Sequence, residues 1–265
     1  MAFSNIDVEE VFGDFVEWYG GIVSDRLKGK RTFNADYIFH DAKVVAELKT
    51  LKEDPFKNKY FLKSLDNKKR EWIQRGYITV SELNAVTRLK QLPEKCRRDT
   101  EKLYIRPLKT HLEKANLQIK STKTVSGLEG YKGLLILVSD GNFLLDPKSI
   151  RLALTGLVAN GKYSGINTIS YLTVNVVTTR PDDPTLSRLW TNFFRDADHM
   201  QGEVSLGFLD DLFDKWASFY SEVTGISLRK ISEVNERGLT EVDLLKSTRF
   251  VRPPKSRSPD EGFPS

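Results

Sequence analysis

The sequence is poor in the residues that bind soft metals or form disulfides. Its 265 residues include a single cysteine, Cys96, and three histidines. One cysteine excludes an intrachain disulfide and a zinc site built on several cysteines of one chain. His40, His111 and His199 lie far apart in the sequence, so we interpret each as an ordinary polar or surface residue.

Long apolar runs are also absent. No segment approaches the roughly 18 to 20 apolar residues that cross a bilayer. The opening stretch MAFSNIDVEEVF lacks the basic flank and apolar run of a signal peptide. We therefore expect no membrane association and a cytoplasmic location.

The glycine patterns of common nucleotide and nucleophile sites are missing as well. There is no Walker-type loop, no Gly-x-Gly-x-x-Gly after a strand and no Gly-x-Ser-x-Gly elbow. No nucleotide cofactor is expected.

Positive charge is concentrated in one part of the chain. The net charge is only +5, yet residues 52–132 hold 20 Lys and Arg against 10 Asp and Glu. The remaining residues hold 21 against 26. A basic segment on an otherwise slightly acidic chain indicates a partner that carries negative charge.

The apolar patterns predict an α/β fold with a mixed central sheet flanked by helices. We expect helices from Asn5 or Asp7 through IVSDRL, from Asp146 to Gly161 and over 205–225, and strands over 31–40, 42–51, 133–142 and 166–177. Residues 178–185 are expected to form a loop, and the rest of the segment after them to be mostly helical. Pro55, Pro93 and Pro107 punctuate a long stretch of helical character between the second and third strands, and its clearest pieces are residues 67–76, 81–92 and 103–119.

This order predicts a discontinuous core with an insertion. The core comprises residues 1–51 and 131–180, and a basic helical subdomain comprises residues 52–130. A helical segment, 181–250, is expected to pack on the core, and the proline- and serine-rich tail, 251–265, to be disordered.

Three charged residues stand in the first predicted hairpin, NADYIFHDAKVVAELKTL. Glu47 and Lys49 are two residues apart in a strand, so their side chains point to the same face. With a turn near residues 40–43, Asp36 lies across from Glu47. Two carboxylates and an ammonium group would then share one patch.

Such a patch suits a hard divalent cation. Mg²⁺ commonly uses one or two carboxylates and completes its shell with water and phosphate. A bound metal ion makes its water more acidic and stabilises charge on a phosphodiester, and a lysine can assist.

These residues resemble the catalytic pattern of the PD-(D/E)XK nuclease superfamily, which includes many restriction, repair and recombination nucleases. Asp36 matches the first acid and Glu47-Leu48-Lys49 matches the acid-x-lysine element, whereas Ala35 replaces the proline of the family pattern. The resemblance covers residues 5–51 and 131–177, and it implies a restriction-endonuclease-like core of a helix, three strands, a helix and a further strand.

The resemblance implies an Mg²⁺-dependent nuclease, in which Mn²⁺ can replace Mg²⁺. Asp36 and Glu47 are the expected metal ligands and Lys49 the residue that assists the attacking water. A carboxylate of the first helix often completes the site in relatives. Among Glu9, Glu10 and Glu17 we select Glu10.

The basic segment is the expected contact to DNA, with RNA left open as a substrate. Lys and Arg neutralise phosphates, and neighbouring aromatic residues can stack on bases. The expected contacts are Lys68, Lys69, Arg70, Arg75, Arg97, Arg98 and Arg106. A homodimer would suit a restriction-type enzyme, because a palindromic duplex presents two equivalent strands.

Other interpretations stay open at this point. Asp36 can be a turn cap, with Glu47 and Lys49 an exposed cross-strand pair. The chain can also be an inactive nuclease-fold protein that binds nucleic acid or assembles a complex. A third alternative is a scaffold whose closing helix binds a partner through Phe208, Leu212, Trp216 and Phe219.

Overall fold

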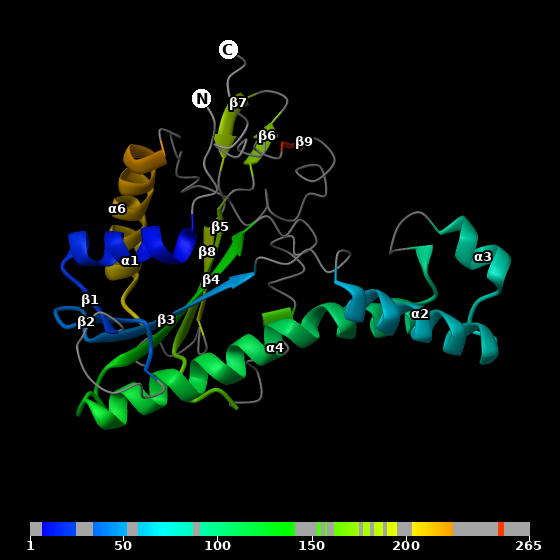
Figure 1. Ribbon diagram of the computed structural model, residues 1–265, viewed down its shortest axis with the longest axis horizontal. Coiled ribbons are helices and arrows are strands. Elements are labelled where there is room, and N and C mark those ends of the chain that lie inside the picture. Colours follow the sequence, from blue (N-terminus) through cyan, green and yellow to red (C-terminus); the bar gives the residue numbers. More distant parts are fainter. Residues whose placement is uncertain are drawn as a thin grey trace, which may run out of the picture. The chain divides into compact units, whose positions relative to one another are not determined.

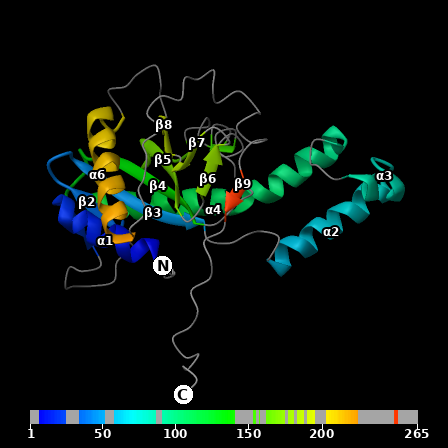
Figure 2. The ribbon, with the colours of Figure 1, turned by 90° about the horizontal axis from the view of Figure 1, so that it is seen from above.

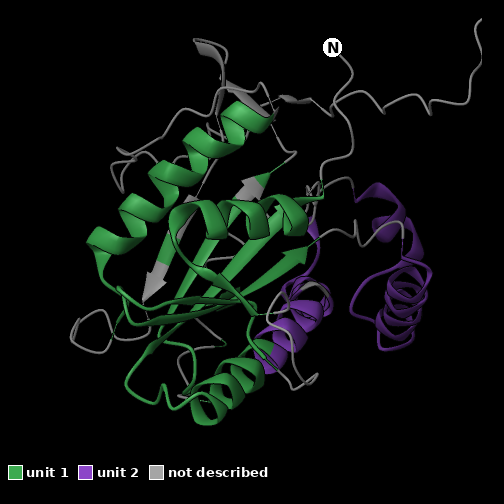
Figure 3. Ribbon diagram, turned by 60° about the vertical axis from the view of Figure 1, so that its left-hand side comes forward, with its two compact units in different colours: residues 1–52, 115–265 green, residues 53–114 purple. Residues whose placement is uncertain are grey.

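The computed structural model of the chain describes residues 7–24, 34–51, 58–86, 91–140, 153, 154, 157, 162–174, 177–180, 183–187, 190–194, 203–224 and 249–251. The chain divides into two compact units (Figure 3). The larger unit contains residues 1–52 and 115–265, and the smaller one contains residues 53–114.

A mixed sheet of six strands lies at the centre of the larger unit (Figure 1). Its strands, in spatial order, are β1 (Ile22–Val23), β2 (Tyr37–Phe39), β3 (Val44–Leu51), β4 (Lys132–Asp140), β5 (Thr168–Val174) and β8 (Trp190–Phe194). Strands β1, β2 and β3 pair antiparallel, β3, β4 and β5 pair parallel, and β8 returns antiparallel. The expected α/β class, with a mixed sheet flanked by helices, is confirmed.

The hairpin between β2 and β3 fixes which side chains share a face. Its turn is closed by the Lys43 N–H, which donates to the His40 carbonyl over 3.0 Å, and Lys43 has a positive φ of 52°. Tyr37 pairs with Ala46 in the resulting register. Because successive side chains alternate, Ala46 and Leu48 point to one face of β3 while Glu47 and Lys49 point to the other.

Helix α1 (Val8–Tyr19) begins and ends at clear capping residues. The Asp7 side chain caps its N-terminus, and Gly20 ends it in the left-handed conformation, with φ of 93°. The expected continuation of this helix through IVSDRL is therefore wrong, since Ile22 and Val23 form β1 and pair with β2.

Helices α1 and α6 (Leu206–Thr224) lie side by side against one face of the sheet (Figures 1 and 2). Phe12 and Phe15 of α1 each contact Trp216 of α6, with ring centroids 4.8 and 5.3 Å apart. This core also contains Leu212, and Phe208 and Phe219 pack against it partly buried. The apolar stripe of α6 thus packs within the larger unit.

Residues 115–125, about the last third of α4 (Glu94–Val125), belong to the larger unit and contact β4 and the segment before β5. The Asn116 amide oxygen accepts from the Gly165 N–H over 2.8 Å. Gly133 leaves no room for a side chain, because an added Cβ would lie 1.8 Å from the Gly165 carbonyl oxygen and 3.0 Å from Ile119. Gly133 sits opposite Val45, two residues before Glu47, so this part of α4 lies on the face to which Glu47 points.

The smaller unit is helical, with α2 (Lys59–Gln74), α3 (Val80–Ala85) and residues 94–114 of α4. Its small core is built on Trp72, Ile78 and Cys96. The Trp72 indole N–H donates to the Asp99 carboxylate over 3.2 Å, which satisfies a polar atom in this core.

The structure differs from several expectations. Residues 115–130, expected in the insertion, lie in the larger unit. The helical piece expected over residues 103–119 is part of a longer helix, α4, which runs through Pro107. Residues 178–185 were expected to be a loop and the segment after them helical, but β6 (Val177–Arg180) and β7 (Asp183–Ser187) form a second sheet with β9 (Arg249–Val251). Strand β8 also lies in this segment, paired with β5, so a mostly helical 181–250 is wrong for residues 183–187 and 190–194.

Two expectations fall on residues outside the described ranges. The helix expected from Asp146 to Gly161 is described only at residues 153, 154 and 157, which are helical, and the tail beyond residue 251 is not described. Among the helices that the structure describes, none combines the length and apolar character needed to cross a membrane.

Candidate metal and phosphodiester site

Asp36 and Glu47 hold each other in place at the point where β2 begins. The Asp36 backbone N–H donates to Glu47 Oε2 over 3.1 Å, and Asp36 Oδ2 accepts from the Leu48 N–H over 2.8 Å. The Asp36 side chain thereby extends the hydrogen bonding between β2 and β3 beyond their last backbone pair, Tyr37 and Ala46. Both carboxylates are fixed by backbone donors of the neighbouring strand.

Lys49 completes the group. Its ammonium group donates to Glu47 Oε1, so both oxygens of the Glu47 carboxylate carry a hydrogen bond. The Glu47 side chain is 0% exposed, whereas that of Lys49 is 20% exposed. The expected juxtaposition of two acids and one amine is present, and burial of Glu47 rules out the interpretation of an exposed cross-strand pair.

The electrostatic balance of this group is unfavourable for a charged Glu47. Burial is the largest effect and the Asp36 charge the second, and together they raise the pKa of Glu47 from an ordinary 4.5 to about 8. Lys49 and the Asp36 N–H act in the opposite direction. One lysine does not offset the burial of one carboxylate beside another, so the site favours an additional positive charge, either a proton or a cation.

The chemistry of the donor atoms fits a small divalent cation. Mg²⁺ prefers oxygen ligands and commonly takes only one or two carboxylates from the protein. Asp36 and Glu47 supply two from adjacent strands. Within the described ranges no group of three or more His, Cys, Asp and Glu side chains is placed to hold a metal ion, so any cation here would take its other ligands from water, backbone or substrate.

The first helix brings a different glutamate to β3 than the one selected from the sequence. Glu9 accepts a hydrogen bond from the Thr50 hydroxyl. Glu10 is exposed, and the described residues give it no hydrogen bond or ion pair to Asp36, Glu47 or Lys49. Glu9 is thus the glutamate of α1 that contacts β3, and the selection of Glu10 as a metal ligand stays a prediction.

Comparison with known proteins finds no matching family model, no matching curated protein and no matching solved structure.

The basic residues expected to contact nucleic acid lie on exposed helix surfaces of the smaller unit, and most carry an acidic partner. The observed pairs are Lys68–Glu71, Lys69–Asp66, Arg75–Glu71, Arg97–Glu101 and Arg98–Glu94. Arg70 and Arg106 are exposed and form no ion pair with a described residue. Exposed pairs of this kind are weak, so they leave the arginines and lysines able to exchange a carboxylate for a phosphate.

Sequence reasoning missed two residues of α4 beside the site. Thr122 Oγ1 accepts from the Ala35 N–H over 2.6 Å, and Gln118 Nε2 donates to the Asn34 carbonyl over 3.3 Å. They are four residues apart and therefore lie on one helix face. The available signal was a pair of polar residues at this spacing next to the buried Ala115 and Ile119.

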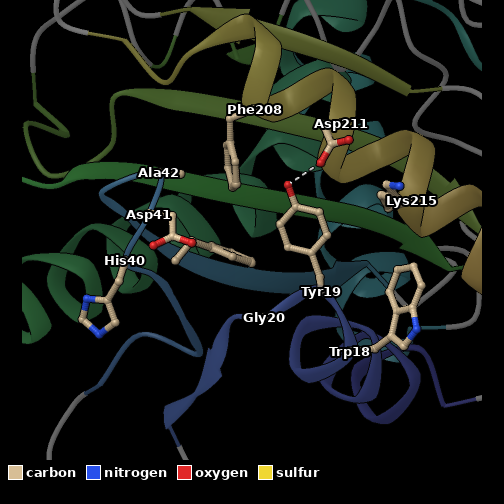
Figure 4. A pocket seen from close by; sticks show the side chains of 10 residues that line it. Trp18, Tyr19, Gly20, His40, Asp41, Ala42, Phe208, Asp211 and Lys215 are labelled. Atoms are coloured by element: carbon tan, nitrogen blue, oxygen red, sulfur yellow. Dashed lines mark hydrogen bonds between the residues drawn. The ribbon is translucent and has the colours of Figure 1, made fainter.

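A separate pocket of about 390 Å³ opens at the end of α1 (Figure 4). It is lined by aromatic rings, among them Tyr19 and Phe208, and by charged groups, among them Asp41 and Lys215. The Tyr19 hydroxyl donates to Asp211 over 2.7 Å and so links α1 to α6. Burial, followed by the hydrogen bond and charge of Asp211, raises the pKa of Tyr19. Asp36, Glu47 and Lys49 are not among the residues that line this pocket.

Proposed function

We propose that this chain is a divalent-metal-dependent nuclease that hydrolyses phosphodiester bonds in DNA. The observation that supports the proposal best is the convergence of Asp36, Glu47 and Lys49, with Glu47 fully buried and short of positive charge. The proposal also draws on the expected core of a helix, three strands, a helix and a further strand. Helix α1 precedes β2 and β3, and β4 and β5 follow as parallel neighbours of β3, while the helix expected between β4 and β5 is described only at residues 153, 154 and 157.

Asp36 and Glu47 would hold the cation, Mg²⁺ or Mn²⁺. When bound, such a cation supplies positive charge that acidifies a nearby water and offsets charge on the phosphoryl oxygens. Binding would also relieve the repulsion between the two carboxylates. A proton on Glu47 would compete with the cation, so metal binding is expected to strengthen as pH rises toward 8 and above.

Lys49 is the one described amine at the carboxylate pair. Its partly exposed ammonium group can turn from Glu47 toward a water molecule and toward the phosphate. In the reaction the water oxygen forms a bond to phosphorus, and the bond between phosphorus and one of the two sugar oxygens breaks. The water loses a proton, and the leaving sugar oxygen takes one up. Lys49 would orient the water and neutralise the negative charge that develops on the phosphate.

The test is cleavage of plasmid and single-stranded DNA with Mg²⁺ or Mn²⁺. We expect Lys49→Ala and Glu47→Gln to lower the cleavage rate by at least about 100-fold, which is typical for loss of a group that acts in the transition state. Lys215→Ala and Glu222→Gln, exposed changes on α6, are the matched controls and should cleave like the wild type. Equal rates in wild type and Lys49→Ala would contradict the proposal.

An inactive nucleic-acid-binding protein is the second candidate. It is favoured by the hydrogen bonds that Lys49 and the Asp36 N–H donate to the two oxygens of Glu47, because such bonds can give this carboxylate a structural role in the hairpin. The same assay separates the two candidates. DNA binding without cleavage in both the wild type and Lys49→Ala would support this alternative.

A further inference from the structure

A single peptide group just before Asp36 is held on both sides by α4. The peptide that joins Asn34 to Ala35 has one carbonyl and one N–H. Gln118 donates to the carbonyl over 3.3 Å, and Thr122 accepts from the N–H over 2.6 Å. Two side chains one helical turn apart therefore fix the plane of this peptide.

The burial of these groups makes the Thr122 contact the more important one. Ala35 is 0% exposed and Thr122 is 2% exposed. A buried N–H that loses its acceptor is costly, because water cannot replace the missing partner. The peptide will therefore rotate or shift if Thr122 loses its hydroxyl.

The orientation of this peptide reaches the two carboxylates through one intervening residue, the buried Ala35. Asp36 follows it, and the Asp36 N–H donates to Glu47. The Asp36 carbonyl accepts from the Ser24 N–H over 2.8 Å, and its side chain accepts from the Leu48 N–H. A rotation before Asp36 would move the donor to Glu47 and the Asp36 carboxylate together.

We propose that Thr122, assisted by Gln118, is a positioning residue that sets the geometry of the Asp36–Glu47 carboxylate pair for a divalent cation. Thr122 itself touches neither cation nor substrate. The inference rests on the proposed metal site, and it assigns to α4 a role beyond covering the sheet. Groups that orient metal ligands commonly affect metal affinity by about 10- to 100-fold.

The direct test is the affinity for Mn²⁺, measured by titration of the full-length chain followed by electron paramagnetic resonance. Thr122→Val keeps the shape but removes the acceptor, and we expect its Kd to rise by about 10- to 100-fold. Thr122→Ser keeps the hydroxyl and should restore the wild-type value. Thr124→Val, an exposed change two residues along the same helix, should leave the Kd unchanged.

A metal-free measurement keeps this inference separate from the proposed function. Amide hydrogen exchange at Ala35 and Asp36 should become at least about 10-fold faster in Thr122→Val, and stay unchanged in Thr124→Val. All variants are compared at a temperature where circular dichroism shows them folded. If Thr122→Val does not fold, Gln118→Met removes the other bond to the same peptide and takes its place in both measurements.

The outcomes are distinct. Wild-type protein that binds no Mn²⁺ contradicts the metal site, while faster exchange in Thr122→Val would still support control of this peptide by α4. Wild-type binding with the same Kd and the same exchange rates in Thr122→Val would overturn the positioning role and leave the metal site standing. A weaker Kd that Thr122→Ser does not restore would also overturn it.

Discussion

At the residue scale, the charge of Glu47 is poorly offset, because its side chain is buried beside Asp36 and has one lysine as partner. Its pKa of about 8 in the folded protein lies above the ordinary 4.5 that it regains on unfolding. Between these values the folded state binds more protons than the unfolded state. The contribution of Glu47 to the free energy of unfolding therefore falls as pH rises from about 4.5 to about 8. Above the folded pKa this contribution is lost.

Glu47→Gln should remove this pH dependence, because the amide cannot ionise. Relative to the wild type, the variant should gain stability between pH 5 and pH 9. We expect the gain in its free energy of unfolding to be about 3 to 5 kcal/mol at most. Urea denaturation at a series of pH values measures it. Taking the difference of the two curves cancels the other titrating groups.

Two controls decide whether Glu47 is the cause. Glu222→Gln, an exposed change on α6, should follow the wild-type curve across the whole pH range. Adding Mg²⁺ at pH 8 to 9 should stabilise the wild type and have little effect on Glu47→Gln, because a bound cation replaces the missing proton. Parallel wild-type and Glu47→Gln curves would show that Glu47 ionises normally.

At the element scale, the sequence predicted elements with strong local patterns. Helix α1 has a capping Asp7 and an apolar stripe, and β4 is a continuous apolar run ending in a turn signal. Strand β1 was missed because its two residues hold no periodicity and form only by pairing with β2. Strand β8 was missed for a similar reason, since its partner β5 lies outside the local sequence.

The carboxylate pair could be foreseen from the same local logic. A hairpin register and side-chain alternation were enough to place Asp36 across from Glu47 and Lys49 beside it. The role of Thr122 could not be foreseen, since it lies 87 residues from its partner Ala35. A helical piece was expected over residues 103–119, but the full length of α4, from Glu94 to Val125, follows only from the three-dimensional structure.

The contact of β4 with the segment before β5 allows a sharp test of packing. In Gly133→Ala the new Cβ would overlap the Gly165 carbonyl, a backbone atom that cannot turn aside. We expect a loss of about 3 kcal/mol or more in the free energy of unfolding, measured by urea denaturation. Gly130→Ala, three residues earlier with nothing within 4 Å of the added Cβ, should change stability by less than about 0.5 kcal/mol.

The Gly133→Ala substitution should also affect the Asp36–Glu47 carboxylate pair, because Gly133 lies opposite Val45 on β3, two residues before Glu47. A displaced β4 should shift Glu47 and weaken Mn²⁺ binding in Gly133→Ala alone. Equal stabilities of the two glycine variants would mean that Gly165 moves away readily and that this contact does not fix the sheet.

At the scale of the whole molecule, charge is divided between the two units. Residues 53–114 contain 16 Lys and Arg against 9 Asp and Glu, a net charge of +7. With the whole chain at +5, the larger unit is left at −2. This division separates the proposed tasks, because a cation site needs surrounding negative charge and a phosphate-binding surface needs positive charge.

The smaller unit should therefore supply most of the salt-dependent part of DNA binding. Arg70 and Arg106 are the best candidates for phosphate contacts, since they are exposed and form no ion pair with a described residue. Each phosphate contact contributes about 0.9 to the slope of log K against log salt for duplex DNA. Arg70→Gln with Arg106→Gln should thus reduce the slope by about 2.

The comparison that tests this assignment is a double variant of equal charge change in the larger unit. Lys43→Gln with Lys215→Gln also removes two positive charges, both from exposed positions. Fluorescence anisotropy with a labelled duplex, at 50 to 300 mM salt and with EDTA to prevent cleavage, gives both slopes. A slope near the wild-type value in the lysine variant and a reduced one in the arginine variant would place the phosphate contacts on the helices of residues 53–114. Equal reductions would instead mean that DNA responds to total charge, and that the smaller unit has no special part in binding.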